Sequence, residues 1–590
     1  MAAVNVNALP VLIVGAGPTG LACAMSLARA RINVRLIDRA PQAATHSRAI
    51  GIQARTLELF EQHRLVDPIL EIGHRLRAAN LYSNGARLAR LDFDPLHTRY
   101  PYLLCLDQSQ TERVMTEHLA RLGVAVERGV ELVGLRQDAT QVEVELAHPG
   151  GRQELCHAAY VVGADGAHST VRHLLGLSFA GQTLEQTFLL ADLQIVSDLS
   201  DDEFHLFASA DGLAAVIPMG GGRHRFIADN ASVAMNGAGQ PEATGEAHAG
   251  AGAGAVTQAT MQDAVRMHAD GHVAASIDAN STPSLELCRA VAERRAHHPL
   301  MLSELGWSSY FHINSRMVER LRMQRVFLAG DAAHVHSPAG AQGMNTGIQE
   351  ALNLGWKLAC IVSGCAGDAL LDTYQVERHP IERDVLRQTA FITQLAEAER
   401  GPLKLLRECV MPVLAAFGPL RDAARLMVSE LAIQYRRSPL TLERVLDGGP
   451  RAGERAPDAL VHVVDGPLGQ APGTGRLYDL HDPGFFSLFI LVETPSGEEP
   501  TTALAAPKLK PDPELDRLSA TIEAALPGAV RIWRVTDAGN DESASLTLTY
   551  GRTRPAFYLV RPDGYIGARG RPASDTSALA RHCETWFKAS

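Results

Sequence analysis

Three short apolar runs, each ending in glycine or aspartate, stand out in the hydrophobic pattern of this chain. They are Val11–Val14 before Gly15-Ala-Gly17, Tyr160–Val162 before Gly163-Ala-Asp165-Gly166, and Val326–Ala329 before Gly330-Asp331. A short apolar run bounded by turn residues is typical of a strand that a parallel sheet buries on both faces. Because ligands of such sheets bind at the carboxyl ends of the strands, the three runs are predicted to serve one ligand.

The first run opens a G-x-G-x-x-G pattern made by Gly15, Gly17 and Gly20. A helix predicted from Pro18 to Arg31 follows at once, so its amide N–H groups can face a pyrophosphate. The first glycine permits the tight turn, the second lets the backbone approach phosphates, and the third brings helix and strand together. Asp38 ends the next predicted strand, where a carboxylate binds a ribose diol. This order favours a dinucleotide site over a glycine turn without a ligand.

The first pattern serves NAD and FAD equally, and the other two runs distinguish them. Together the three motifs resemble those of class A flavoprotein aromatic hydroxylases, which have the para-hydroxybenzoate hydroxylase fold, in the branch of phenol hydroxylase and 3-hydroxyphenylpropionate hydroxylase. The resemblance implies that Asp165, with Arg172, lies where flavin and nicotinamide both pass. It also implies that Asp331 binds the ribityl chain of FAD, that Arg48 lies near the FAD phosphates, and that Gln108 lies beside the flavin.

The segment Ser337-Pro-Ala-Gly-Ala-Gln-Gly-Met-Asn345 extends the resemblance. In the family it runs along the isoalloxazine ring, which assigns Pro338, Gly343, Met344 and Asn345 to cofactor binding. Its glycines let the backbone lie against a flat ring, and a helix predicted from about Thr346 to Ile361 follows. A helix N-terminus aimed at the flavin would stabilise the negative charge of the reduced ring, which predicts an easily reduced flavin.

The predicted fold class is α/β, with a Rossmann-like FAD-binding domain interleaved with a mixed β-sheet substrate domain and followed by a thioredoxin-like C-terminal α/β domain. Short strands separated by turn residues between Phe188 and Ala228 predict the sheet, which in the family roofs the aromatic substrate. The Ala/Gly-rich stretch from Asn236 to Thr260 is predicted to be a loop. The predicted boundaries are 1–182 for the first part of the FAD-binding domain, 183–320 for the substrate sheet, 321–395 for the second FAD-binding part, 396–447 for a helical segment and linker, and 448–590 for the last domain.

The last domain resembles the thioredoxin-like domain of phenol hydroxylase relatives. Its only cysteine is Cys583, so no C-x-x-C is present and redox catalysis there is not expected. We expect a role in packing or in homodimer formation.

Composition excludes several other classes of protein. The 590 residues carry a net charge of −11, with Lys and Arg scattered, which argues against nucleic acid and anionic membrane partners. No apolar run reaches the roughly 18 to 20 residues of a membrane span, and no basic segment precedes the first apolar strand, so a cytoplasmic protein is expected. The eight cysteines show no metal-binding spacing with histidines, so no metal is expected.

The resemblance implies a monooxygenase with bound FAD, NADPH or NADH as co-substrate, O2, and a small phenolic substrate. In the family, the reduced flavin and O2 form a flavin hydroperoxide, and its terminal oxygen passes to the ring carbon ortho or para to the phenol oxygen. The pocket has to exclude water to protect that species. Candidates to activate the phenol are the polar residues on the predicted substrate strands that can accept or relay a proton: His205, His224, Tyr310 and His312.

Other functions remain open at this stage. A Baeyer–Villiger or epoxidising monooxygenase acting on a polyketide-like ring would keep every cofactor motif, and a non-catalytic flavin-binding interaction protein is the alternative from another class. A flavin halogenase is disfavoured because the four tryptophans form no W-x-W-x-I-P motif. Ile50 stands where phenol hydroxylase carries an acidic residue, which argues against a simple phenol hydroxylase.

Overall fold

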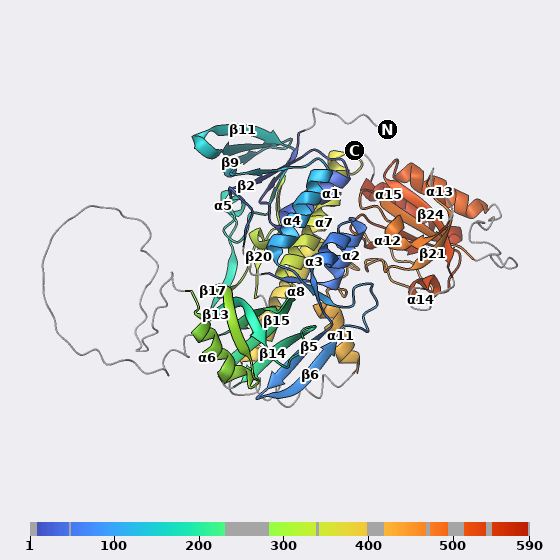
Figure 1. Cartoon of the computed structure of the whole chain (residues 1–590). Helices are drawn as coiled ribbons and strands as arrows, with labels where there is room; N and C mark the ends of the chain where they lie inside the picture. Colours follow the sequence, from blue (N-terminus) through green and yellow to red (C-terminus); the bar gives the residue numbers. More distant parts are fainter. Residues whose placement is uncertain are drawn as a thin grey trace, which may run out of the picture.

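The computed structural model describes residues 9–45, 49–209, 211–229, 282–337, 341–397, 418–467, 473–493, 512–538 and 545–587. Figure 1 shows a central body of helices, a large sheet below it that ends at β5 and β6, and a separate C-terminal sheet beside α2. The Ala/Gly-rich stretch, Arg48 and Pro338 lie outside the described residues.

The three apolar runs are neighbours in one six-stranded sheet. Its order is β18 (Arg322–Met323), β19 (Val326–Leu328), β12 (Tyr160–Gly163), β1 (Val11–Val14), β2 (Val34–Asp38) and β8 (Val126–Arg128). The pairs β1 with β12, β12 with β19, and β1 with β2 are parallel, and Val14 faces Gly163, which in turn faces Leu328. The prediction that these runs end at one edge of a parallel sheet is confirmed.

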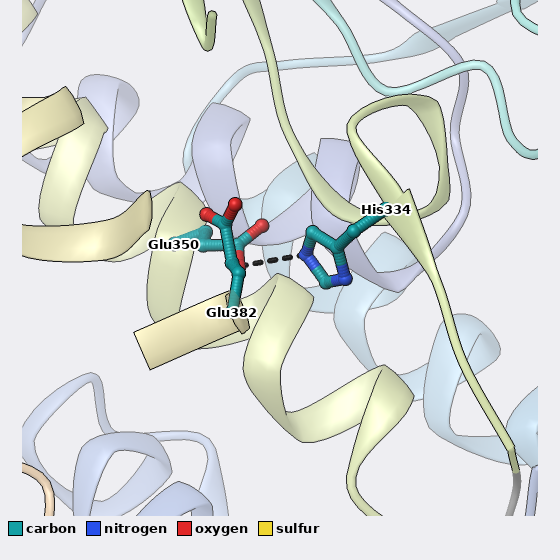
Figure 2. A group of neighbouring side chains, drawn as sticks. All are labelled: His334, Glu350 and Glu382. Atoms are coloured by element: carbon teal, nitrogen blue, oxygen red, sulfur yellow. Dashed lines mark hydrogen bonds and ion pairs between the residues drawn. The ribbon is translucent and has the colours of Figure 1, made fainter. Parts of the chain in front are cut away.

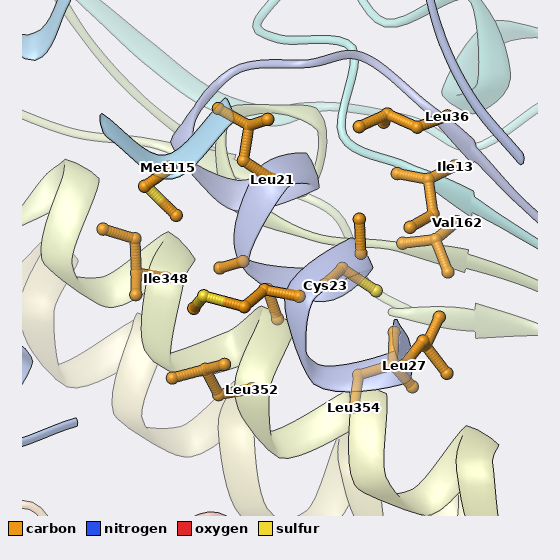
Figure 3. Packing of buried hydrophobic residues seen from close by; sticks show 14 of the residues in the cluster. Ile13, Leu21, Cys23, Leu27, Leu36, Met115, Val162, Ile348, Leu352 and Leu354 are labelled. Carbon is orange, nitrogen blue, oxygen red and sulfur yellow. The ribbon is translucent and has the colours of Figure 1, made fainter. Parts of the chain in front are cut away.

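Helices α1 (Pro18–Arg29) and α7 (Gly343–Val362) pack together beside this sheet. Figure 3 shows Leu21, Cys23 and Leu27 of α1 between the strands and Leu352 and Leu354 of α7, and all five side chains are buried. Helix α7 begins at Gly343, three residues earlier than predicted. The other helices of this body are α2 (Ala54–Gln62), α3 (Val66–Ile72), α4 (Gln108–Arg121), α5 (Thr170–Leu174), α8 (Ala369–Glu397) and α11 (Gly418–Val428).

The predicted substrate sheet has eight strands. Their order is β20 (His334–Val335), β17 (Met301–Met317), β13 (Ala180–Val196), β16 (Arg223–Ala228), β15 (Gly212–Gly220), β14 (Glu203–Ser209), β5 (Ala78–Ser83) and β6 (Ala86–Asp92). Strands β5 and β6 come from the first 182 residues, and β5 joins β14 in parallel while the other pairs are antiparallel. The sheet is therefore mixed, as predicted, and the FAD-binding part contributes two of its strands.

The two faces of this sheet have different neighbours. Leu189, Ala191, Val216 and Phe226 pack against the helix α6 (Leu285–Ala296). On the opposite face Ile217 packs with Ile50, Leu76 and Cys105, which belong to or flank the small sheet β3 (Gly51–Ile52), β7 (Leu103–Cys105) and β4 (His74–Leu76). We call this opposite face the inner face, because it is turned toward the FAD-binding body.

The C-terminal sheet has the order β22 (Gly473–Arg476), β21 (Leu460–Asp465), β24 (Val530–Asp537), β23 (Phe486–Leu491), β25 (Ala556–Val560) and β26 (Ile566–Gly570). Its helices are α12 (Leu477–Leu480), α13 (Pro513–Ala525), α14 (Leu546–Tyr550) and α15 (Pro572–Phe587). Trp356 of α7 and Leu370 of α8 share one hydrophobic cluster with Phe486 and Leu488. The C-terminal domain thus packs its core directly onto the FAD-binding body.

A third small sheet joins β9 (Glu131–Gln137), β10 (Val142–Ala147) and β11 (Gln153–Ala158). Within the described ranges, no helix has both the length and the apolar character that crossing a membrane requires.

Candidate cofactor and substrate site

A cavity of about 220 Å³ lies at the carboxyl edge of the parallel sheet. It is smaller than the roughly 300 to 1,000 Å³ of whole ligand pockets, so its size suits one part of a dinucleotide. Four separate stretches of the chain supply its walls, three of them from predicted motifs: Val14, Gly15 and Gly17; Asp38 and Arg39; Ala164, Asp165, Gly166 and Thr170; and Val130, Glu131 and Leu132.

The glycines of the first motif are required by space. Gly15 has a φ of +105°, and a Cβ there would collide with the carbonyl oxygen of Ala164. A Cβ at Gly20 would collide with the carbonyl oxygen of Gly15, so helix and turn are in direct contact. At Gly17 no atom lies within 4 Å of the position that a Cβ would take, and Gly17 lines the cavity. This leaves an open cradle at the N-terminus of α1, which fits a pyrophosphate.

Asp38 lies in the cavity at the end of β2. One carboxylate oxygen accepts a hydrogen bond from the N–H of Ala16 at 2.7 Å, and the other accepts from the N–H of Ala40 at 2.8 Å. These bonds fix the carboxylate beside the glycine turn, where a ribose diol is expected. Arg128 lies 3.4 Å away.

Asp165 acts chiefly on its own segment. Its carboxylate accepts hydrogen bonds from the hydroxyl of Ser169 at 2.5 Å and from the N–H of Val171 at 3.2 Å, which caps helix α5. The backbone around Asp165 lines the cavity. Arg172, almost fully buried, donates to the carbonyl oxygen of Ala332 at 2.9 Å. Arg172 therefore ties the second motif to the third.

The third motif forms a tight turn against helix α1. Gly330 has a φ of +58°, and a Cβ there would collide with the side chain of Thr19. The turn holds Asp331 at the surface of the protein. Figure 2 shows the buried group behind the turn, in which His334 donates to Glu350 at 2.8 Å.

Asn345 joins the start of α7 to the start of α2. Its Oδ1 accepts a hydrogen bond from the N–H of Gln53, and its Nδ2 donates to the carbonyl oxygens of Gly51 and Ala341. Met344 packs on the main core, and Gly343 begins the helix next to the ring of His336. Gln108 begins α4 and donates to Glu112 at 2.7 Å. The predicted residues of the ring segment that the structure describes are thus gathered at one helix N-terminus.

These features fit FAD. The open cradle at Gly17, the fixed carboxylate of Asp38 and the Gly330–Asp331 turn all lie around the N-terminus of α1. Helix α7 is connected to the same turn through Glu350, which accepts a hydrogen bond from the N–H of Gly330. Three motifs distant in the sequence therefore form one site.

The inner face of the substrate sheet carries a buried ion pair. Arg225 of β16 is 1% exposed and donates to both carboxylate oxygens of Asp192 on β13, at 2.7 and 2.8 Å. The strand register puts Arg225 opposite Ile217, an inner-face residue, and Trp307 opposite Asp192. Asp107, which precedes Gln108, lies 3.9 Å from the guanidinium of Arg225. A guanidinium paired with a carboxylate is thus held among apolar and aromatic side chains beside the β7–α4 junction.

The structure does not bring the four predicted phenol-activating residues to this face. His205 contacts Tyr82 in the α6-side cluster and the carbonyl oxygen of Ser200, and Tyr310 packs against the same cluster. His224 lies two residues before Phe226 of that cluster, so it points to the same face, and it contacts Asp201. His312 is exposed and lies 3.4 Å from the hydroxyl of Thr187. Strand prediction without a register cannot tell the two faces of a sheet apart, because alternate side chains point in opposite directions.

The sequence analysis did not identify two sets of buried charged residues, although the sequence around each set indicates them. Arg225 directly precedes the apolar residues Phe226-Ile-Ala228 of one strand, and Asp192 interrupts another apolar strand. Glu350 and Lys357 are the charged residues of helix α7, and both are fully buried. A charged side chain in a buried strand or helix needs a partner of opposite charge. A charged residue within an apolar segment therefore indicates a buried ion pair.

Comparison with known proteins gives concordant results. The family model described as an FAD binding domain matches residues 8–389. The chain is 34% identical to 6-methylpretetramide 4-monooxygenase of Streptomyces rimosus, over 97% of this chain and 92% of that protein. It is 31% identical to pentachlorophenol 4-monooxygenase of Sphingobium chlorophenolicum, over 95% of this chain and 93% of that protein. The solved structure of the anhydrotetracycline hydroxylase OxyS from Streptomyces rimosus superposes with a TM-score of 0.70 at 29% identity, covering 98% of this chain and 99% of that one.

Proposed function

Because this chain belongs to the FAD binding domain family, and within it to the FAD-dependent aromatic monooxygenases, we propose that its substrate is a fused-ring phenol. The enzyme adds one oxygen atom of O2 to the phenolic ring and consumes NADPH or NADH. The observation that carries the choice of substrate is similarity along almost the whole chain to enzymes named for 6-methylpretetramide and anhydrotetracycline.

The inner face of the substrate sheet supports a large apolar substrate. Phe188, Leu190 and Phe311 form one cluster there, with Trp307 and Ile227 packed against it. Aromatic and aliphatic side chains of this kind favour stacking on a flat ring system. Trp307 and Ile227 are only partly buried, and a flat fused-ring molecule would cover more of their apolar surface than a single ring.

We propose that Arg225 binds the phenol oxygen. Its guanidinium is the buried cation of the inner face, and a cation stabilises a phenolate relative to the neutral phenol. Asp192 orients the guanidinium through two hydrogen bonds, which keeps its plane fixed when substrate arrives. Phenolate character raises the electron density of the ring carbons that receive oxygen.

In this proposal each motif binds a different part of FAD. The cradle at Gly17 would hold the pyrophosphate, Asp38 the ribose, and Asp331 the ribityl chain, while the N-terminus of α7 would face the ring. Bound FAD supplies electron transfer from the nicotinamide and activation of O2. The apolar inner face excludes water from the reacting groups.

The seven cysteines of the described residues are free thiols, which fits our expectation of a cytoplasmic enzyme. Homodimer formation stays a prediction.

A substrate panel tests the proposal. Purified enzyme with FAD is given fused-ring phenols, chlorophenols and hydroxybenzoates, and both NAD(P)H oxidation and products are measured. We expect fused-ring phenols to give the fastest coupled turnover and a product with one added hydroxyl. Faster turnover of a chlorophenol would favour a single-ring substrate, as the pentachlorophenol relative indicates. A product with an oxygen inserted into the ring would instead show Baeyer–Villiger chemistry.

A further inference from the structure

Behind the Gly330–Asp331 turn lies a buried group of His334, Glu350 and Glu382, which come from β20, α7 and α8 (Figure 2). Each of the three side chains is at most 1% exposed. The position on α8 is far in the sequence from every cofactor motif. The group is therefore a feature of the three-dimensional fold that the motifs alone do not assign.

Glu350 binds the residues on both sides of Asp331, Gly330 and His334. One carboxylate oxygen accepts the N–H of Gly330 at 2.9 Å, and the other accepts Nε2–H of His334 at 2.8 Å. Asp331 lies between these two anchor points in the chain. Gly330 is held at a φ of +58°, so the turn is also one that few residues other than glycine adopt. The position of Asp331 therefore depends on Glu350.

Glu382 brings a second carboxyl group to the same place. One of its carboxyl oxygens lies within 4.8 Å of a carboxylate oxygen of Glu350 and a ring nitrogen of His334, and neither of its buried oxygens accepts a hydrogen bond from a donor among the described residues. Two adjacent carboxylates cannot both stay charged in a dry interior. Burial, and then the Glu350 carboxylate, raise the pKa of Glu382 well above its usual range. Glu382 is thus the protonated member of the pair.

Charge partners keep Glu350 ionised. Burial alone would raise its pKa, but the neighbouring His334 and the hydrogen bonds from His334 and Gly330 lower it to about 2. Burial opposes the protonation of His334 as well, yet Glu350 raises the pKa of His334 to about 9. The charged and titratable groups that face this pair from the surrounding elements are Asp331, His336, Tyr374, Arg378, His379, Glu382 and Glu430.

We propose that Glu350 is a positioning residue for FAD: its carboxylate, paired with His334, holds the turn that presents Asp331, while Glu382 holds a proton so that only one of the two buried carboxyls is charged. A divalent cation is a poor occupant of this place, because the guanidinium of Arg378 lies 3.6 Å from Glu350. The inference rests on the assignment of this turn to FAD and is independent of the identity of the aromatic substrate.

The test measures the affinity of FAD-free enzyme for FAD by flavin fluorescence, in wild type, Glu350→Gln and Glu382→Gln. We expect Glu350→Gln to weaken binding by roughly tenfold or more, the size of a lost charge-assisted hydrogen bond. Glu382→Gln is the matched control, since glutamine resembles a protonated glutamate, and it should stay within about twofold. Equal losses in the two variants, or one metal ion per chain that Glu382→Gln releases, would overturn the proposal.

A pH series gives an independent readout that holds even if Glu350→Gln does not fold. His334 has a pKa raised above its unfolded value of about 6.5, so its contribution is complete below that pH and is lost as the pH rises through about 9. Wild-type FAD affinity should fall over this range, and His334→Gln should remove the fall. An unchanged affinity across the range would contradict the proposal. Tight FAD binding without oxygenation of any fused-ring phenol would reject the proposed substrate and leave this inference standing.

Discussion

The backbone N–H of Gln53 donates a hydrogen bond of 2.9 Å to Oδ1 of Asn345, which joins the start of α2 to the start of α7. Asn345 is fully buried and also donates to the carbonyl oxygens of Gly51 and Ala341, at 2.9 and 2.7 Å. The two helices and the segment before α7 are therefore one unit. This unit contains Gly343, Met344 and Asn345, which the family resemblance assigns to the flavin ring.

Replacing Asn345 by aspartate tests this connection. Asn345→Asp keeps the acceptor for Gln53 but removes the donor to the carbonyl oxygens of Gly51, in a buried contact, and Ala341, in a partly buried one. A buried carbonyl oxygen left without a donor costs about 1 to 3 kcal/mol. We expect urea unfolding of the FAD-free protein to show a loss of about 2 kcal/mol or more, together with weaker FAD binding. Asn84→Asp, at an exposed turn, is the control and should have little effect. Equal stability of the two variants would count against the connection.

Asp331 is predicted to bind FAD, because the Gly330–Asp331 turn holds its exposed side chain at the surface. Asp331→Ala should lower the FAD content after gel filtration. The control is Asp384→Ala, which removes an exposed aspartate of α8. A variant that purifies as yellow as the parent protein would contradict the placement of Asp331.

Arg225 is predicted to act on substrate and not on FAD. Arg225→Met alone would leave Asp192 buried without its partner, which costs roughly 3 to 5 kcal/mol, so the test uses the double variant with Asp192→Asn. We expect this double variant to bind FAD and to lose roughly tenfold or more in product formation, since a buried cation is removed. Arg223→Met, on the same strand and 53% exposed, is the control. Full activity of the double variant would refute the role of Arg225.

A buried group of charged residues joins the C-terminal domain to the FAD-binding body. Arg561 donates to both carboxylate oxygens of Glu377 on α8, at 2.7 and 2.9 Å, and Lys357 of α7 donates to the same carboxylate at 2.8 Å. Glu377→Gln should therefore destabilise the protein by roughly 3 to 5 kcal/mol. Glu117→Gln, in the exposed pair with Arg113, should change stability by about 1 kcal/mol or less. Similar unfolding curves for the two variants would show that the contacts of Glu377 with Arg561 and Lys357 contribute little to stability.

The sequence was sufficient for the parts of the site that depend on local pattern. Strand Val11–Val14 has the predicted bounds and β2 ends at Asp38 as predicted, and their motifs meet at one sheet edge because the two strands are parallel neighbours. The sequence could not assign the inner face, because His205 and Arg225 both lie on strands and only the register separates them. It also could not pair Glu382 with Glu350, or Arg561 with Glu377, since these contacts depend on how helices pack across the fold.

Isotopically labelled O2 tests directly whether this protein is an FAD-dependent aromatic hydroxylase. The FAD-loaded enzyme is given NAD(P)H and the best fused-ring phenol of the panel under labelled O2, and the product is analysed by mass spectrometry and for ring connectivity. The account predicts one labelled oxygen atom, attached as a hydroxyl to an intact ring. A protein that takes up no FAD, or a product whose added oxygen comes from water, would contradict it.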